Sequence, residues 1–201
     1  WTVTVCPIFS AGAISTTGEP ICSGGTPQNT IGNVTAASGG NGVISYQWKA
    51  NGVVISGATG ASYTPGFPIT QTTTFTRWAK DSQCNMSFTQ STGSWTVVVL
   101  QPFDPGEIPN GSSSICSGGI PGTIGSLRDA SGGNGVITYQ WKANGVVISG
   151  AIGASYTPNS QLTQTTTYTR WAKDGKCNTS FTQSTGGWTF TVSQLASITS
   201  I

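Results

Sequence analysis

The stretch SGGNGVISYQWKANGVVISGA occupies residues 38–58 and returns at residues 131–151 with a single change, Ser45 to Thr138. The offset between the two copies is 93 residues, which is the size of a small protein domain. Near identity at a domain-sized period indicates that one folded module is used at least twice in succession. Such repeats are typical of extended arrays, in which the number of copies supplies reach and multivalency.

Each copy carries the signals of β-structure. In the second copy, Ile137, Tyr139 and Trp141 alternate with residues of the opposite strand face. Asn144-Gly145 then separates two apolar runs, which is the strongest short signal for a β-hairpin. Further β-branched and aromatic runs follow between Gly-rich breaks, and no segment shows a capped helical stripe. Short strands at this spacing predict a β-sandwich.

Five cysteines are present, and four of them fall at repeat-equivalent positions, Cys22 with Cys116 and Cys84 with Cys177. The simplest pairing is one bridge per module, Cys22–Cys84 and Cys116–Cys177, which indicates an oxidising, extracellular location. Reduced core cysteines in a cytosolic protein are the alternative. Since the chain has no His and no C-x-x-C motif, we expect no metal and no cofactor.

A tryptophan lies between the two cysteines of each module, Trp48 in the first and Trp141 in the second. The order Cys, Trp, Cys is that of immunoglobulin-type sandwiches, where the Trp packs on a disulfide between the sheets. The predicted fold is therefore all-β, with two tandem immunoglobulin-like β-sandwich domains that each contain one disulfide. Because they alternate in phase with Tyr46 and Tyr139, both tryptophans are expected in the core rather than on a binding platform.

The module boundaries follow from matching strand sequences. WTVTV at residues 1–5 copies the later segments WTVVV and WTFTV, so we expect the last strand of a preceding repeat there, in a segment of a longer chain. The predicted division continues with residues 6–100 as the first immunoglobulin-like repeat, residues 101–193 as the second and residues 194–201 as the start of a following repeat.

Cys6 is the odd cysteine, because Leu100 and Ser193 stand at its equivalent positions. The module itself therefore requires no thiol there. Either Cys6 bridges to another chain or to a residue outside this segment, or it stays unpaired and buried.

Charge is scarce, at 7% of residues against about 25% in typical proteins, and the formal net charge is +2. The eight Lys and Arg residues are scattered, so no nucleic-acid partner is expected. No apolar run approaches the ~18 residues of a membrane span. The absence of His removes Ser–His and Cys–His activation of a nucleophile, so we predict that the chain is not an enzyme.

Some tryptophans exceed what a small core needs, and they mark a candidate contact surface. One interpretation is that they form contacts between modules, or between chains in a filament. Alternatively, they stack on the sugar rings of surface glycans, or they pack within their own module. These residues are Trp78, Trp95, Trp171 and Trp188. Arg77 and Arg170 share a strand face with Phe75 and Tyr168, and if that face is inward, each Arg needs backbone carbonyls as partners.

A longer run of motifs joins YQW, an ISGAxGASYTP block, a TTT-aromatic-x-Arg strand and the second Cys. It occupies Tyr46–Trp48, Ile55–Pro65, Thr72–Arg77 and Cys84, and it recurs between Tyr139 and Cys177. This run, about two-thirds of each module, resembles the Ig-like repeats of giant secreted and cell-surface proteins of Bacteroidota, which include gliding-motility adhesins and related surface filaments. The chain departs from that pattern in a shortened insert after the Trp and in Thr92–Trp95 before the last strand.

The resemblance implies extracellular or cell-surface placement, adhesive or scaffold use, and no catalytic residue. We therefore expect a structural or adhesive segment of a long extracellular bacterial surface protein or filament. Its expected partners are neighbouring repeats of the same chain, other copies of itself in a filament, and surface glycans. Two alternatives stay open: a carbohydrate-binding accessory module of a secreted protein, and a fibre subunit that polymerises by strand exchange through residues 1–5.

Overall fold

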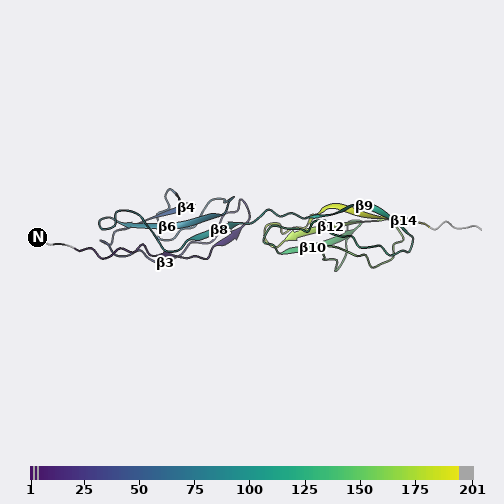
Figure 1. The fold of residues 1–201 in the computed structure, drawn as a ribbon, viewed down its shortest axis with the longest axis horizontal. Helices are drawn as coiled ribbons and strands as arrows, with labels where there is room; N and C mark the ends of the chain where they lie inside the picture. The colour runs from purple at the N-terminus through teal and green to yellow at the C-terminus, as the bar shows by residue number, and fades with distance from the viewer. Residues whose placement is uncertain (2, 4, 195–201) are drawn as a thin grey trace, which may run out of the picture. The chain divides into compact units, whose positions relative to one another are not determined.

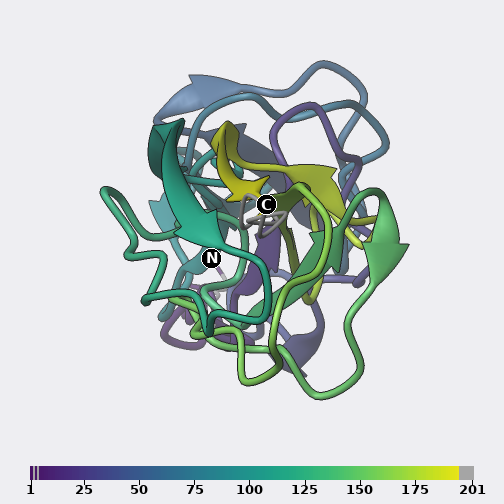
Figure 2. The same ribbon diagram turned by 90° about the vertical axis from the view of Figure 1, so that its right-hand side faces the viewer.

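The structure, a computed structural model, describes residues 1, 3 and 5–194 of the 201-residue chain. Every regular element in that range is a β-strand, which confirms the predicted all-β class (Figures 1 and 2). The chain divides into two compact units, unit 1 (Trp1–Leu100) and unit 2 (Gln101–Ile201).

Unit 1 is built on one six-stranded sheet with β6 near its centre. The sheet order is β2 (Glu19–Ile21), β8 (Trp95–Val99), β6 (Thr73–Asp81), β4 (Ile44–Ala50) and β5 (Val53–Val54), with β7 (Thr89–Gln90) beside β6 (Figure 1). A second layer covers one face of this sheet. It contains the pair β1 (Ala13–Ile14) and β3 (Asn33–Thr35), and single bridges between Gly25 and Ile69 and between Ile31 and Tyr63.

Unit 2 repeats this arrangement. Its sheet order is β9 (Glu107–Cys116), β14 (Thr185–Ser193), β12 (Thr166–Asp174), β10 (Ile137–Ala143) and β11 (Val146–Val147), with β13 (Thr182–Gln183) beside β12. Single bridges of the second layer join Gly119 to Leu162 and Ile124 to Tyr156. The main difference lies in the first strand, which is one continuous element in unit 2 and is split into β1 and β2 in unit 1.

The first and last strands of each unit pair in parallel. In unit 2, β9 and β14 run together from Glu107 opposite Thr185 to Cys116 opposite Ser193. In unit 1, β2 and β8 pair in the same sense. Because both strands of such a pair start at the same end of the sandwich, the chain enters a unit at one end and leaves at the other. We call these ends the upstream pole and the downstream pole of the unit.

The predicted hairpins form as two-residue turns. Asn51 and Gly52 have φ of 47° and 82°, and Asn144 and Gly145 have the same values. Two successive positive φ angles define the type I′ turn, whose twist matches that of the strands on either side. The hairpins β4–β5 and β10–β11 are therefore fixed by the local sequence.

Trp48 and Trp141 are completely buried, which confirms the prediction that they belong to the core. In unit 1 the Trp48 ring lies 5.6 Å from that of Tyr63, and its Nε1 donates to the carbonyl of Gly60 at 2.8 Å. This hydrogen bond joins the sheet to the second layer and satisfies the indole N–H. Trp141 makes the equivalent contacts with Tyr156 and Gly153 in unit 2.

The described residues at the two ends of the chain lie outside the strands. Trp1, Val3 and Val5 are exposed and lie outside any strand, while Thr2 and Thr4 fall outside the described residues. Their assignment to a preceding repeat stays a prediction. The predicted start of a further repeat at residues 194–201 lies outside the described residues except for Gln194. Within the described part of the chain, none of the secondary structure is a helix of the length and apolarity that crossing a bilayer takes.

Candidate functional site

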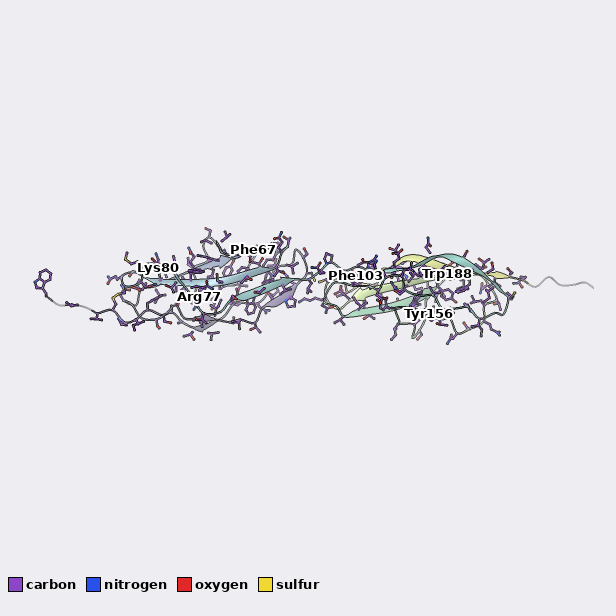
Figure 3. All side chains as sticks on the ribbon, viewed as in Figure 1. Phe67, Arg77, Lys80, Phe103, Tyr156 and Trp188 are labelled. Carbon is purple, nitrogen blue, oxygen red and sulfur yellow. A yellow bond between two sulfur atoms is a disulfide. The ribbon has the colours of Figure 1, made fainter. Side chains whose placement is uncertain are left out.

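The most buried charge in each unit is an arginine on the central strand. Arg77 of β6 and Arg170 of β12 have no solvent exposure, and each side chain points from the sheet toward the second layer. Figure 3 labels Arg77 together with Lys80, which lies on the opposite face of the same strand because side chains alternate. The inward face of β6 therefore presents Arg77 between the apolar residues Phe75 and Ala79.

The guanidinium of Arg77 donates to every segment that surrounds it. The acceptors are Ser91 Oγ, Asn33 Oδ1 and the carbonyls of Ala61, Ala11, Ala13 and Thr35, at 2.6–3.3 Å. The ring of Tyr46 lies 4.9 Å from the guanidinium carbon. These contacts confirm the predicted carbonyl partners, and they connect β6 with β1, β3 and the loops of the second layer. Burial lowers the pKa of Arg77, whereas Tyr46 acts in the opposite direction.

Arg170 makes the same set of contacts in unit 2. It donates to Ser184 Oγ, Ser126 Oγ and the carbonyls of Ala154, Pro105, Glu107 and Arg128, at 2.7–3.4 Å. Asp129 approaches it at 3.9 Å but is itself well exposed. Both units thus neutralise a buried cation mainly with backbone dipoles, so the arginine serves as a crosslink between the two layers.

Each unit also buries one carboxylate at its upstream pole. Asp81 and Asp174 end the central strands and are almost completely shielded. Burial by itself would raise the pKa of Asp174, but N–H groups of Cys177, Lys176 and Asn178 donate to the carboxylate, and its pKa is lowered overall. This capping gives the two aspartates a structural role in the turns that follow the central strands.

The disulfide pairing differs from the prediction. Cys84 is bonded to Cys6, with 6.2 Å between their Cα atoms, and Cys116 has a free, exposed thiol. The predicted pairs Cys22–Cys84 and Cys116–Cys177 are therefore wrong, and Cys6 is neither unpaired nor bonded to another chain. Cys22 and Cys177 are also in the disulfide state.

The position of the cysteines explains this result. Cys22 follows β2, whose Ile21 pairs with Val99 at the downstream pole of unit 1. Cys84 follows the end of β6, which runs antiparallel to β8 and so ends at the upstream pole. The two residues are separated by the length of the sandwich, and a disulfide requires Cα atoms within about 7 Å. Cys116 and Cys177 lie at opposite poles of unit 2 for the same reason.

The four candidate contact tryptophans do not form one surface. Trp95 is 6% exposed and belongs to the core of unit 1, so its assignment to a contact surface is wrong. Trp188 is half-buried, packs against the core of unit 2 and has the backbone of Gly111 against its ring. Only Trp78 and Trp171 lie on the outer sheet face, and each is half-buried.

A row of lysine–aromatic pairs follows this outer face in both units. Lys49 Nζ lies 3.7 Å from the centroid of the Trp78 ring, and Lys80 Nζ lies 4.9 Å from that of Phe88. The pairs in unit 2 repeat these distances, with Lys142 over Trp171 and Lys173 over Phe181. A cation covers each Trp ring, so the ring is not an open platform for a sugar. Among the described residues, none of these four lysines has a carboxylate within ion-pair distance.

Other sites for chemistry are few in the described range. A depression in unit 2 is lined by residues 148–153, 155–157 and 159. Residues 1, 3 and 5–194 contain no cluster of three or more potential metal-ligating side chains.

Comparison with known proteins shows the fold. Residues 105–194 match the profile of a family described as "Domain of unknown function (DUF8696)". A search of curated protein sequences finds no match. An I-band fragment of titin is similar at a TM-score of 0.57 and 12% identity, over 96% of this chain and 67% of that chain. A three-Ig titin structure with an E-to-A change has a TM-score of 0.50 at 12% identity, over 96% and 67% of the two chains.

A fragment of mouse cadherin-23 is similar at a TM-score of 0.49 and 18% identity, over 94% of this chain and 65% of that chain. At these identities, the similarity to titin establishes architecture and nothing further. It confirms the predicted pair of immunoglobulin-like β-sandwich domains.

Proposed function

We propose that this chain is a structural segment of a long extracellular tandem-repeat protein at a bacterial cell surface, in which the units act as load-bearing spacers of an adhesin or filament. The sequence resemblance to surface repeats of Bacteroidota supports the location and the source. The parallel pairing of the first and last strands in each unit supports the load-bearing role.

The mechanical argument rests on the seam between β9 and β14. Tension applied to the ends of unit 2 pulls β9 and β14 in opposite directions along their own axes, because the chain enters and leaves at opposite poles. The inter-strand hydrogen bonds are then loaded together in shear, and they must break nearly at once. A pull applied at one pole would instead break them one by one.

The buried arginine supports the same role. Arg170 connects the start of β9, through the carbonyls of Pro105 and Glu107, to the centre of the sheet. The first strand is thus held by the seam on one side and by a buried crosslink on the other. In both units, the buried arginine thus forms hydrogen bonds that connect separate strands.

A single-molecule pulling experiment tests this proposal. Handles on Glu107 and Ser193 load the seam in shear, whereas handles on Glu107 and Thr185, which are partners at one end of the seam, open it stepwise. With a reductant present, we expect a clearly higher unfolding force in the first geometry. Equal forces in the two geometries would contradict a load-bearing seam. Antibodies against the chain should also label intact cells of the producing organism.

A second candidate function is binding of acidic glycans to the lysine–aromatic row. Because the four lysines of this row have no carboxylate partner in the part of the chain that the structure describes, their charges are available to a sulfate or carboxylate on a polysaccharide. Sulfated heparin and neutral dextran are suitable probes. Salt-sensitive retention on heparin that is lost in the double variant Lys49→Gln, Lys142→Gln would favour this function, and equal behaviour toward both polymers would exclude it.

Strand exchange through residues 1–5 stays a third prediction. Deletion of residues 1–5 should abolish assembly while leaving both units folded. Unchanged assembly of the shortened chain would remove this alternative.

A further inference from the structure

Cys116 occupies a specific place at the downstream pole of unit 2. It is the last residue of β9 and lies opposite Ser193, the last residue of β14. The N–H of the next residue, Ser117, donates to the carbonyl of Ser193 at 3.0 Å. The exposed thiol is therefore located directly beside the chain as it leaves the unit.

The equivalent residue of unit 1 has the same surroundings but a different chemical state. The carbonyls of Cys22 and Cys116 each accept a hydrogen bond of 2.9 Å from a glycine N–H, Gly25 and Gly119 respectively. Cys22 is nevertheless in the disulfide state, whereas Cys116 is a free thiol. The fold therefore allows a disulfide at this position, and in unit 2 the same position carries a free thiol.

The upstream pole contains the complementary cysteine. Cys84 and Cys177 sit in equivalent turns, held by hydrogen bonds from their N–H groups to Asp81 and Asp174 at 2.8 and 2.7 Å. Both are in the disulfide state. The partner of Cys84 is Cys6, which lies near the start of unit 1. In unit 1, the upstream cysteine is thus bonded to a residue that precedes the first strand.

We propose that Cys116 is the attachment point of a further repeat, and that its thiol forms a disulfide with the upstream-pole cysteine of a repeat following residue 194. This proposal depends on the proposed function in one respect, namely that a further repeat follows unit 2 in the same chain. The bond would fix one joint of the array covalently in addition to the linker.

The geometry supports this reach. Cys6 and Ser193 are equivalent positions of the repeat, and the Cα atom of Cys6 lies 6.2 Å from that of the upstream cysteine Cys84. Cys116 is the cross-strand neighbour of Ser193, about 5 Å away. Suppose that a following repeat places its upstream cysteine beside Ser193 as unit 1 places Cys84 beside Cys6. That cysteine would then lie within about one strand spacing of bonding distance to Cys116.

The reaction is a two-electron oxidation of two thiols. With glutathione disulfide as oxidant, the Cys116 thiolate attacks one sulfur and releases one glutathione thiolate. The second cysteine, as its thiolate, then displaces the other glutathione from the mixed disulfide. Two protein thiols lose two protons and two electrons, and one glutathione disulfide becomes two glutathione molecules.

The test uses residues 1–194 extended by a second copy of residues 102–194, because Gln194 already occupies the position of Gln101, and the chain is folded in a glutathione redox buffer. Trypsin alone would leave Cys84 and Cys116 on one peptide, because no Lys or Arg occurs between Lys80 and Arg128. A second protease that cleaves at Asp104 separates them. We expect non-reducing mass mapping to find Cys116 joined to the Cys177 position of the added copy.

Two variants serve as controls. In Cys116→Ser, the cysteine of the added copy should become reactive toward iodoacetamide. In the double variant Cys116→Ser, Ile120→Cys, a thiol at another exposed site of the downstream pole should fail to form the bond. The proposal is overturned if Cys116 of the folded, oxidised chain stays alkylatable, or bonds only to other molecules. Surface labelling and pulling forces would be unaffected by that failure.

Discussion

Arg77 Nε donates to Ser91 Oγ at 2.9 Å, and Ser91 Oγ passes a hydrogen bond on to the carbonyl of Ala11 at 2.7 Å. Both side chains are buried. The relay joins β6 to the last turn before β8 and to the first segment of the unit. A cation at the centre of a small sandwich thus adds a hydrogen-bonded link between the layers to the hydrophobic contacts of the core.

Removing this cation should unfold unit 1 selectively. In Arg77→Met, Asn33 Oδ1 and the carbonyls of Ala61, Ala11, Ala13 and Thr35 all lose the guanidinium as a donor. We expect a loss of about 3–5 kcal/mol in the unfolding free energy of unit 1. Urea unfolding followed by hydrogen exchange distinguishes the two units. Lys80→Met, an outward position of the same strand, is the control and should cost less than about 1 kcal/mol.

The buried carboxylates predict acid sensitivity. Since the pKa of Asp174 is lowered in the folded protein, its stabilising contribution is present above the unfolded pKa of about 3.9 and is lost as pH falls through the lower folded value. Thermal unfolding between pH 7 and pH 2 should show a steep fall in Tm below about pH 4. Asp174→Asn should flatten this dependence for unit 2. Lys173→Met changes the charge without removing a carboxylate, and a flattened profile in that variant would contradict the assignment.

Gly133 should be far less replaceable than Gly135. Both have positive φ, 56° and 76°, so alanine at either site is strained. A Cβ at Gly133 would also overlap the carboxylate of Asp174, whereas Gly135 has open space around it. We expect Gly133→Ala to cost at least about 2 kcal/mol and Gly135→Ala about 1 kcal/mol, measured by denaturant unfolding. Equal costs would show that the close contact is unimportant.

The Cys6–Cys84 bridge should stabilise unit 1 alone. It spans a sequence separation of 78 residues, which corresponds to about 4 kcal/mol in the chain-entropy account of disulfides. The double variant Cys6→Ser, Cys84→Ser should lower the Tm of unit 1 and leave that of unit 2 unchanged. Cys116→Ser, which removes a free thiol, is the matched control in the two-unit chain. A comparable loss in the control would argue against a specific role of the bridge.

Trp95 and Trp78 should respond differently to truncation. Trp95 is buried in the core, so Trp95→Ala should cost about 3–5 kcal/mol. Trp78 lies on the outer face beneath Lys49, so Trp78→Ala should cost only about 1–2 kcal/mol. Chemical denaturation of both variants gives the comparison. Similar losses would place Trp78 in the core.

The local sequence predicts much of this fold because its signals are local. Asn51-Gly52 determines a hairpin through two positive φ angles, and the alternation around Trp48 determines which face is buried. The buried Arg77 was predictable for the same reason, since its strand alternates with period 2. These inferences need no knowledge of distant contacts.

The cysteine pairing depends on a different kind of information. The spacing of Cys22, Trp48 and Cys84 is similar to that of immunoglobulin domains. Disulfide pairing, however, depends on the pole at which the strand before each cysteine ends. That position follows from the parallel pairing of β2 with β8, a contact between residues far apart in the sequence. The prediction for Trp95 was wrong for a similar reason. The layer that covers the sheet decides which face of a strand is buried, and Trp95 lies with Val97 on the buried face of β8.

The outer strands of the two sheets have one more consequence. β5 and β11 are two residues long, and the strands at the opposite edges, β2 and β9, contain Pro20 and Pro109. A short edge offers few free backbone groups, and a proline removes a donor from the other edge. Neighbouring copies at high local concentration therefore have few free backbone groups with which to pair edge to edge. The repeat can be multiplied without inviting amyloid-like aggregation.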